Sequence, residues 1–96
     1  MKITVKVFGP VREFIGTGQI EVLLEDGCDL SALLKALIKK YGDGLKDRIL
    51  LNDAELLPYV KVLVNGKNVR DFNGLKTELK DGDEVAIVPA IVGGKY

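Results

Sequence analysis

The longest helical pattern in the chain reads DLSALLKALIKKYG and spans residues 29–42. Its apolar residues recur every three or four positions, which is the period of a helix with one buried face. That apolar stripe consists of Leu30, Leu33, Leu34, Leu37, Ile38 and Tyr41. Asp29 is suited to cap the N-terminus of the helix and Gly42 to end it. We therefore expect one amphipathic helix that packs against another layer.

Strand-like segments flank this helix on both sides. The first segment alternates apolar and polar residues from Lys2 to Phe8, which predicts a half-buried strand. The further predicted strands are Gln19–Glu25, Tyr59–Val64, Lys67–Arg70 and Glu84–Pro89. Asn65-Gly66 predicts a type I′ hairpin turn, because both positions of that turn need a positive φ. The order of elements predicts an α+β domain, with a mixed sheet of four to five strands and one main helix across one face.

Two stretches carry weaker patterns. Gly9-Pro10 is expected to break the first strand, and Arg12–Gly18 to form a connector with a short turn of helix. Residues 43–58 are expected to be irregular, with apolar side chains that attach them to the core.

Composition limits the classes of function. The 96 residues predict one domain, and the balance of 14 basic against 14 acidic residues argues against a nucleic-acid or anionic-membrane binder. A single cysteine, Cys28, excludes an internal disulfide and fits a reducing compartment. No segment approaches the ~20 apolar residues of a membrane span. The N-terminal segment lacks the apolar core of a signal peptide, so a cytoplasmic location is expected.

The chain offers few groups for catalysis of its own. It has no histidine, and one cysteine cannot build a zinc site. Cys28 can be read as a small apolar residue before the helix or as a reactive thiol at a helix N-terminus. Asp81 and Asp83 can be read as an acidic pair or as turn residues around Gly82, and Asp-Gly-Asp before a strand favours the turn.

The alternation of the strands assigns four apolar residues to the face away from the helix: Phe8, Leu63, Ala86 and Val88. Single exposed apolar residues are normal on a protein surface. If the first, third and last predicted strands are neighbours, however, these four form one contiguous patch, and such patches mark partner surfaces. We expect them to form a docking surface.

The C-terminal region carries the most specific motif, LKDGDEVAIVPAIVGG at residues 79–94. Together with FGPVRE at residues 8–13, the helix at 29–34 and VNG at 64–66, it makes the whole chain resemble the ubiquitin-like β-grasp sulfur carriers of the MoaD and ThiS type. Within that family the chain resembles most the small subunit of molybdopterin synthase (molybdopterin converting factor subunit 1). The resemblance implies a β-grasp domain at residues 1–92 and a flexible Gly-Gly tail at 93–96.

The resemblance also implies a function without catalysis by this chain itself. An adenylating enzyme of the ubiquitin-activating type would use ATP to activate the carboxylate of the last glycine, and a sulfur donor would convert the adenylate to a thiocarboxylate. The tail would then deliver sulfur to the large subunit of molybdopterin synthase, for molybdenum or tungsten cofactor synthesis. By resemblance, Gly94 carries the sulfur, Gly93 keeps the tail slim, and the chain itself binds no cofactor.

The chain departs from this family at Lys95-Tyr96, because the carbonyl of Gly94 is a peptide bond until those residues are removed. Trimming by a protease, an inactive relative that retains them, and an artificial addition are the three explanations. Two other functions stay open besides the sulfur carrier: a ubiquitin-like modifier that is joined to lysines, and an inactive β-grasp interaction module.

Overall fold

Five strands form one mixed sheet in the order β2-β1-β7-β5-β6, in the computed structural model, which describes residues 1–89. The strands are β1 (Lys2–Val7), β2 (Gln19–Leu23), β5 (Val60–Val64), β6 (Lys67–Asn68) and β7 (Glu84–Pro89). The pair β1 and β7 runs parallel, and the other neighbouring pairs run antiparallel. The predicted α+β class and mixed sheet are confirmed, and β1, β7 and β5 are neighbours, as the predicted patch requires.

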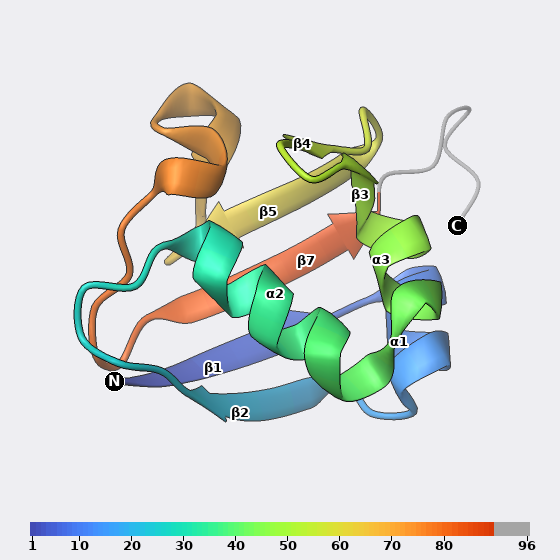
Figure 1. The fold of residues 1–96 in the computed structure, drawn as a ribbon, viewed down its shortest axis with the longest axis horizontal. Helices are drawn as coiled ribbons and strands as arrows, with labels where there is room; N and C mark the ends of the chain where they lie inside the picture. The colour runs from blue at the N-terminus through green and yellow to red at the C-terminus, as the bar shows by residue number, and fades with distance from the viewer. Residues whose placement is uncertain (90–96) are drawn as a thin grey trace.

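The predicted main helix is present as α2 (Leu30–Tyr41), which crosses one face of the sheet (Figure 1). The Asp29 side chain caps it by accepting a hydrogen bond of 2.9 Å from the backbone N–H of Ala32. Its C-terminal end is at Gly42, which adopts a φ of 89° that favours glycine. The leucines of the apolar stripe are buried against the sheet, so the helix supplies the second layer of the core.

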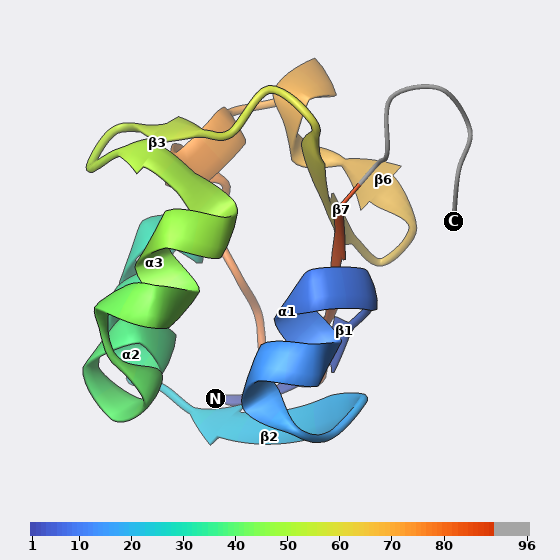
Figure 2. The same ribbon diagram turned by 90° about the vertical axis from the view of Figure 1, so that its right-hand side faces the viewer.

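The core lies between the sheet and the helices. It contains the inward-facing residues of the three central strands together with the leucines of α2. A second helix, α3 (Asp43–Ile49), lies beside α2 on the same side of the sheet, as Figure 2 shows. Within residues 1–89, no helix is long and apolar enough to cross a membrane.

The segment after the first strand was predicted incorrectly. Instead of a break and a connector with only a short turn of helix, a complete helix of seven residues, α1 (Gly9–Ile15), begins directly after Phe8. Proline is tolerated in the first turn of a helix, where its missing N–H has no partner to lose, so Pro10 starts α1 rather than preventing it. Phe8 is the N-cap residue of α1 and not the last residue of the strand.

Residues 43–58 are also more regular than predicted. They form α3 and then a small hairpin of β3 (Leu50–Asn52) and β4 (Glu55–Leu56). The helix has seven residues and buries two apolar side chains, Leu45 and Ile49, which is too short a pattern to reveal its period.

The predicted fourth strand, Lys67–Arg70, is shorter in the structure. It ends at Asn68, whose side chain accepts a hydrogen bond of 3.0 Å from the backbone N–H of Arg70 and caps a 3-10 turn, η1 (Val69–Asp71). A second such turn, η2 (Gly74–Lys76), follows. The hairpin turn before this strand is confirmed, because Asn65 and Gly66 have φ values of 51° and 84°.

Candidate functional site

The last strand, β7, leads the chain out of the middle of the sheet. It lies between β1 and β5, and Val85, Ile87 and Pro89 on its inner side are buried. Pro89 pairs with Val60, so the described chain ends while it is still held by the sheet. The predicted tail residues Gly93 and Gly94, and with them Lys95-Tyr96, lie outside the described residues.

The register of the strands brings the four predicted patch residues together on the outer face. Ala86 on β7 pairs with Leu63 on β5, and Val88 follows Ala86 on the same side of β7. Phe8 follows Val7, which pairs with Ile87, so Phe8 lies level with Val88. Its extended backbone keeps its side chain on the outer side, and the residue is 42% exposed. We call Phe8, Leu63, Ala86 and Val88 the outer-face patch.

Charged side chains border the outer-face patch. Lys6 pairs with Ala86 across the strands, and its ammonium lies 3.3 Å from the Glu84 carboxylate. Lys61, opposite Val88, is exposed. An apolar centre with lysines at its border is typical of a protein-binding surface.

Tyr59 extends this region toward the tail, and the patch predicted from sequence did not include it. It precedes β5 directly and is 48% exposed, next to the position where the chain leaves the sheet after Pro89. Its position one residue before an alternating strand was the signal that could have identified it, since Tyr59, Lys61 and Leu63 share one side of that alternation.

The acidic turn before β7 has a structural role, as favoured from the sequence. The Asp83 carboxylate accepts hydrogen bonds from the Asn65 side-chain amide (2.9 Å) and from the backbone N–H of Lys80 (2.8 Å). The backbone N–H of Glu84 donates to the Asn65 side-chain oxygen at 2.9 Å. The Asp81 carboxylate accepts from the backbone N–H of Lys2 at 2.7 Å. Both acids thus fasten β7 to its neighbours.

The described part of the chain offers no cluster of metal-ligating side chains. Residues 1–89 contain no group of three or more His, Cys, Asp or Glu side chains that could hold a metal ion. Cys28 is partly exposed, and its backbone is held between Glu25 and Leu79 by hydrogen bonds of 3.4 and 3.1 Å. The backbone of Cys28 thus links the segment before α2 to Leu79, which precedes the turn before β7.

Comparison with known proteins identifies relatives that match almost the full chain. Small archaeal modifier protein 3 of Haloferax volcanii is 36% identical over 94 residues, covering 98% of this chain and 100% of the relative. A putative sulfur carrier protein of Archaeoglobus fulgidus is 41% identical over 80 residues, covering 83% of this chain and 89% of the relative. A molybdopterin synthase sulfur carrier subunit of Mycobacterium tuberculosis is 35% identical over 95 residues, covering 98% and 99%. These identities do not single out the molybdopterin branch that the sequence motifs suggested.

Solved structures agree with the fold. Small archaeal modifier protein 1 of Methanosarcina acetivorans superposes with a TM-score of 0.79 at 33% identity, covering 97% of this chain and 96% of that one. The Amycolatopsis orientalis BexX/CysO complex contains a chain with a TM-score of 0.76 at 30% identity, covering 96% and 99%. These likenesses confirm the ubiquitin-like β-grasp fold. The family model described as the ThiS family matches residues 5–94, from the first strand through Gly94, and the chain therefore belongs to the ThiS family.

Proposed function

We propose that this protein is a sulfur carrier whose working C-terminus is Gly94, exposed by removal of Lys95-Tyr96. The observation that carries the proposal is the extent of the family match, which continues through the Gly-Gly pair and stops at Gly94. The name of the Archaeoglobus relative, a putative sulfur carrier protein, points to the same function.

The chemistry of this proposal takes place at the tail and in partner proteins. The Gly94 carboxylate attacks the α-phosphate of ATP on an adenylating partner of the ubiquitin-activating type, and pyrophosphate leaves. A sulfur donor then displaces AMP and leaves a thiocarboxylate on Gly94. A carboxylate is a poor electrophile until it acquires a good leaving group. Because the partner supplies that leaving group, these reaction steps need no acid, base or metal from the carrier. The lack of histidine in the chain is consistent with catalysis by the partner proteins and not by the carrier.

The described structure holds the chain in the sheet as far as Pro89, and the tail of this proposal lies beyond that residue. Pro89 is buried and paired within the sheet, and Gly94 is the fifth residue after it. Five residues in any conformation reach at most about 18 Å. The outer-face patch lies one residue from Pro89, at Val88, so a partner docked there is within reach of so short a tail. Glycine at positions 93 and 94 adds no side chain that would widen the tail inside a partner's channel.

The proposal also names the pathway that uses the sulfur, which is molybdopterin assembly. The similarity to a molybdopterin synthase sulfur carrier subunit favours delivery to the large subunit of a molybdopterin synthase. The CysO relative, solved in a complex with BexX, supports docking of this fold on a partner protein. We place the present chain in molybdopterin assembly on the motifs around Phe8–Glu13 and Leu79–Gly94.

Intact-mass spectrometry of the protein purified from its native host tests this function. We expect a chain that ends at Gly94, with a fraction that is heavier by the difference between sulfur and oxygen. Detection of only the full-length chain ending at Tyr96 would refute the sulfur-carrier proposal. As a control, the chain truncated at Gly94 should support ATP–pyrophosphate exchange by the activating enzyme, and the full-length chain should not.

A second function, a modifier joined through Gly94 to lysines of other proteins, is favoured by the match to small archaeal modifier protein 3 over its full length. It shares the activation step with the sulfur carrier and differs in the acceptor. Branched peptides with Gly94 on a lysine side chain, found by mass spectrometry of a native digest, would favour the modifier. If the truncated chain is never adenylated, both functions fail and an interaction module is left.

A further inference from the structure

A groove lies on the helix layer, away from the outer-face patch. Its central pocket, of about 280 Å³, is formed by α2, α3, β3 and η2. Four apolar residues line it: Leu34, Ile38, Leu50 and Leu75. A second pocket continues past the N-terminal turn of α2 and shares Ser31, Asp53 and Leu75 with the first. The two pockets make one elongated groove with an apolar floor, which we call the α2 groove.

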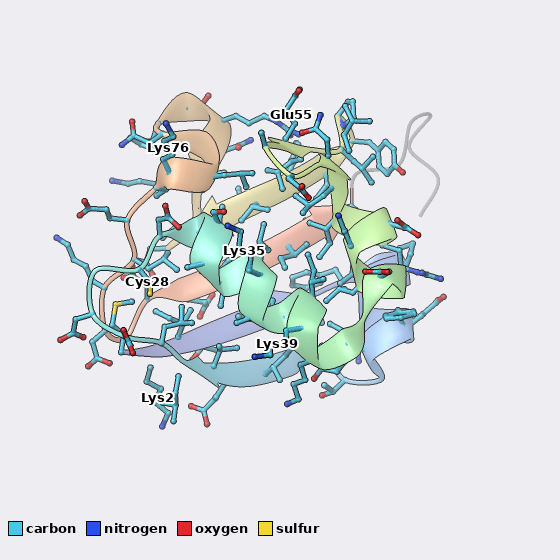
Figure 3. The ribbon with its side chains drawn as sticks, in the orientation of Figure 1. Lys2, Cys28, Lys35, Lys39, Glu55 and Lys76 are labelled. Atoms are coloured by element: carbon cyan, nitrogen blue, oxygen red, sulfur yellow. The ribbon has the colours of Figure 1, made fainter. Side chains whose placement is uncertain are left out.

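The α2 groove has a local excess of positive charge in a chain that is neutral overall. Lys35 and Lys39, one helical turn apart, and Lys76 on η2 border it. All three are exposed, and none makes an ion pair within residues 1–89. Figure 3 shows them on the same side of the molecule, over α2 and the neighbouring turn. Three ammonium groups are thus available to an incoming anionic partner.

The groove also contains two acidic side chains, Asp29 and Asp53. The Asp53 carboxylate lies 3.0 Å from the Lys46 ammonium, which also lines the groove, and it raises the pKa of that lysine through a hydrogen bond and its charge. The Asp29 carboxylate accepts the N-cap hydrogen bond from Ala32. Four lysines (Lys35, Lys39, Lys46 and Lys76) thus line the groove against these two aspartates, and the groove keeps an excess of positive charge.

Shape decides between a compact ligand and a peptide. Pockets for drug-sized ligands usually measure about 300–1,000 Å³ and enclose most of the ligand. The central pocket, of about 280 Å³, falls just below that range, and its continuation, of about 460 Å³, falls within it. The elongated outline of the two together is what favours an extended peptide over a compact ligand. One or two apolar side chains fill such a pocket, and carboxylates on the same peptide reach the bordering lysines.

We propose that the α2 groove is a second docking site, which binds an acidic peptide segment of a partner protein through leucine-like side chains. The site lies on the helix side of the sheet, as Figure 2 shows for α2, while the outer-face patch is on the opposite side. A partner held at the α2 groove therefore leaves the outer-face patch free for a second protein. The proposal is independent of the sulfur chemistry, because it requires no residue of the tail.

The test is an NMR titration of the full-length chain with a synthetic peptide, acetyl-Asp-Leu-Glu-Asp-Leu-Glu-amide, up to millimolar concentration. We expect saturable shifts of the backbone amides from Ser31 to Lys39 and at Lys46 and Leu75. The double variant Lys35→Glu/Lys39→Glu should weaken binding about tenfold, because two exposed ion pairs that each contribute a few-fold are lost. Added salt should weaken it as well.

Matched controls separate this site from general charge attraction. The variant Lys67→Glu/Lys80→Glu carries the same change of charge at two exposed positions outside the groove, and it should bind the peptide within twofold of the unaltered chain. A peptide with serine in place of leucine, or lysine in place of the acids, should not saturate. The proposal is wrong if the acidic peptide does not saturate, if the shifts lie on the sheet face, or if both double variants weaken binding equally.

Discussion

Neighbouring residues of β5 allow the assignment of the sheet faces, and with it the docking surface, to be tested by one pair of substitutions. Val62 points into the core and is fully buried, whereas Leu63 lies on the outer face and is half-buried. The change to aspartate at each position adds the same charge to the same strand. The two variants therefore differ chiefly in the environment of the new carboxylate.

The expected magnitudes differ by several kcal/mol. Val62→Asp loses the burial of a valine, about 1.5–3 kcal/mol, and forces a carboxyl group into an apolar core at a further cost of several kcal/mol. A domain of this size has a free energy of unfolding of about 5–14 kcal/mol, so this variant should be largely unfolded or close to it. Leu63→Asp should lose about 1 kcal/mol, because only part of the leucine is buried.

Urea unfolding followed by circular dichroism measures the stability of both variants, and ATP–pyrophosphate exchange with the activating enzyme measures docking of chains that end at Gly94. Leu63→Asp should fold and dock at least tenfold more weakly, as expected for a residue at the centre of an interface. Leu23→Asp is the matched control, because Leu23 is 80% exposed on the edge strand β2. Equal destabilisation at positions 62 and 63 would refute the face assignment, and equal docking of the Leu63 and Leu23 variants would refute the docking surface.

Three further predictions concern single contacts. Asn65→Ala should lower the free energy of unfolding by about 2–3 kcal/mol, because two side-chain hydrogen bonds are lost and alanine disfavours a positive φ. Asn65→Gly should lower it by about 1–2 kcal/mol, because only the hydrogen bonds are lost. Equal losses in urea unfolding would show that backbone strain contributes nothing. Asp29→Ala removes the cap of α2 and should cost about 1 kcal/mol, while Asp29→Asn should cost little; an unchanged unfolding midpoint in the alanine variant would contradict the cap. Asp53→Asn should lower the pKa of Lys46, which NMR titration of the lysine side chain measures. The free energy of unfolding near neutral pH should change little, because the ion pair is exposed. An unchanged pKa would mean that the ion pair does not form in solution.

The network around Asn65 explains why two motifs that are 18 residues apart belong to one feature. From sequence, the Asn-Gly pair predicts a hairpin and the Asp-Gly-Asp triplet predicts a turn, each from local backbone preferences. In the structure the Asn65 amide joins them, since its nitrogen donates to Asp83 and its oxygen accepts from the backbone of Glu84. This contact ties the hairpin turn at Asn65 to the residue at which β7 starts.

The sequence pattern was sufficient to predict an element where that element is long and buries one face. The stripe of α2, its cap at Asp29, and the alternation of β1, β5 and β7 all follow from periods of 3.6 and 2 residues, so their bounds were predicted to within a residue or two. The same periodicity placed Leu63, Ala86 and Val88 on the outer side. The Gly-Gly pair and the missing histidine likewise needed no structure to direct attention to the C-terminus.

The short elements depended on tertiary packing. Helix α3 and the β3–β4 hairpin contain too few residues for a period to appear, and they are stabilised because Leu45 and Ile49 reach the core beneath them. The α2 groove exists only because α3, β3 and η2 surround one side of α2, and no stretch of sequence contains its walls together. The contiguity of the outer-face patch also required the strand order, since hydrogen bonding between strands far apart in sequence places Phe8, Leu63 and Val88 side by side.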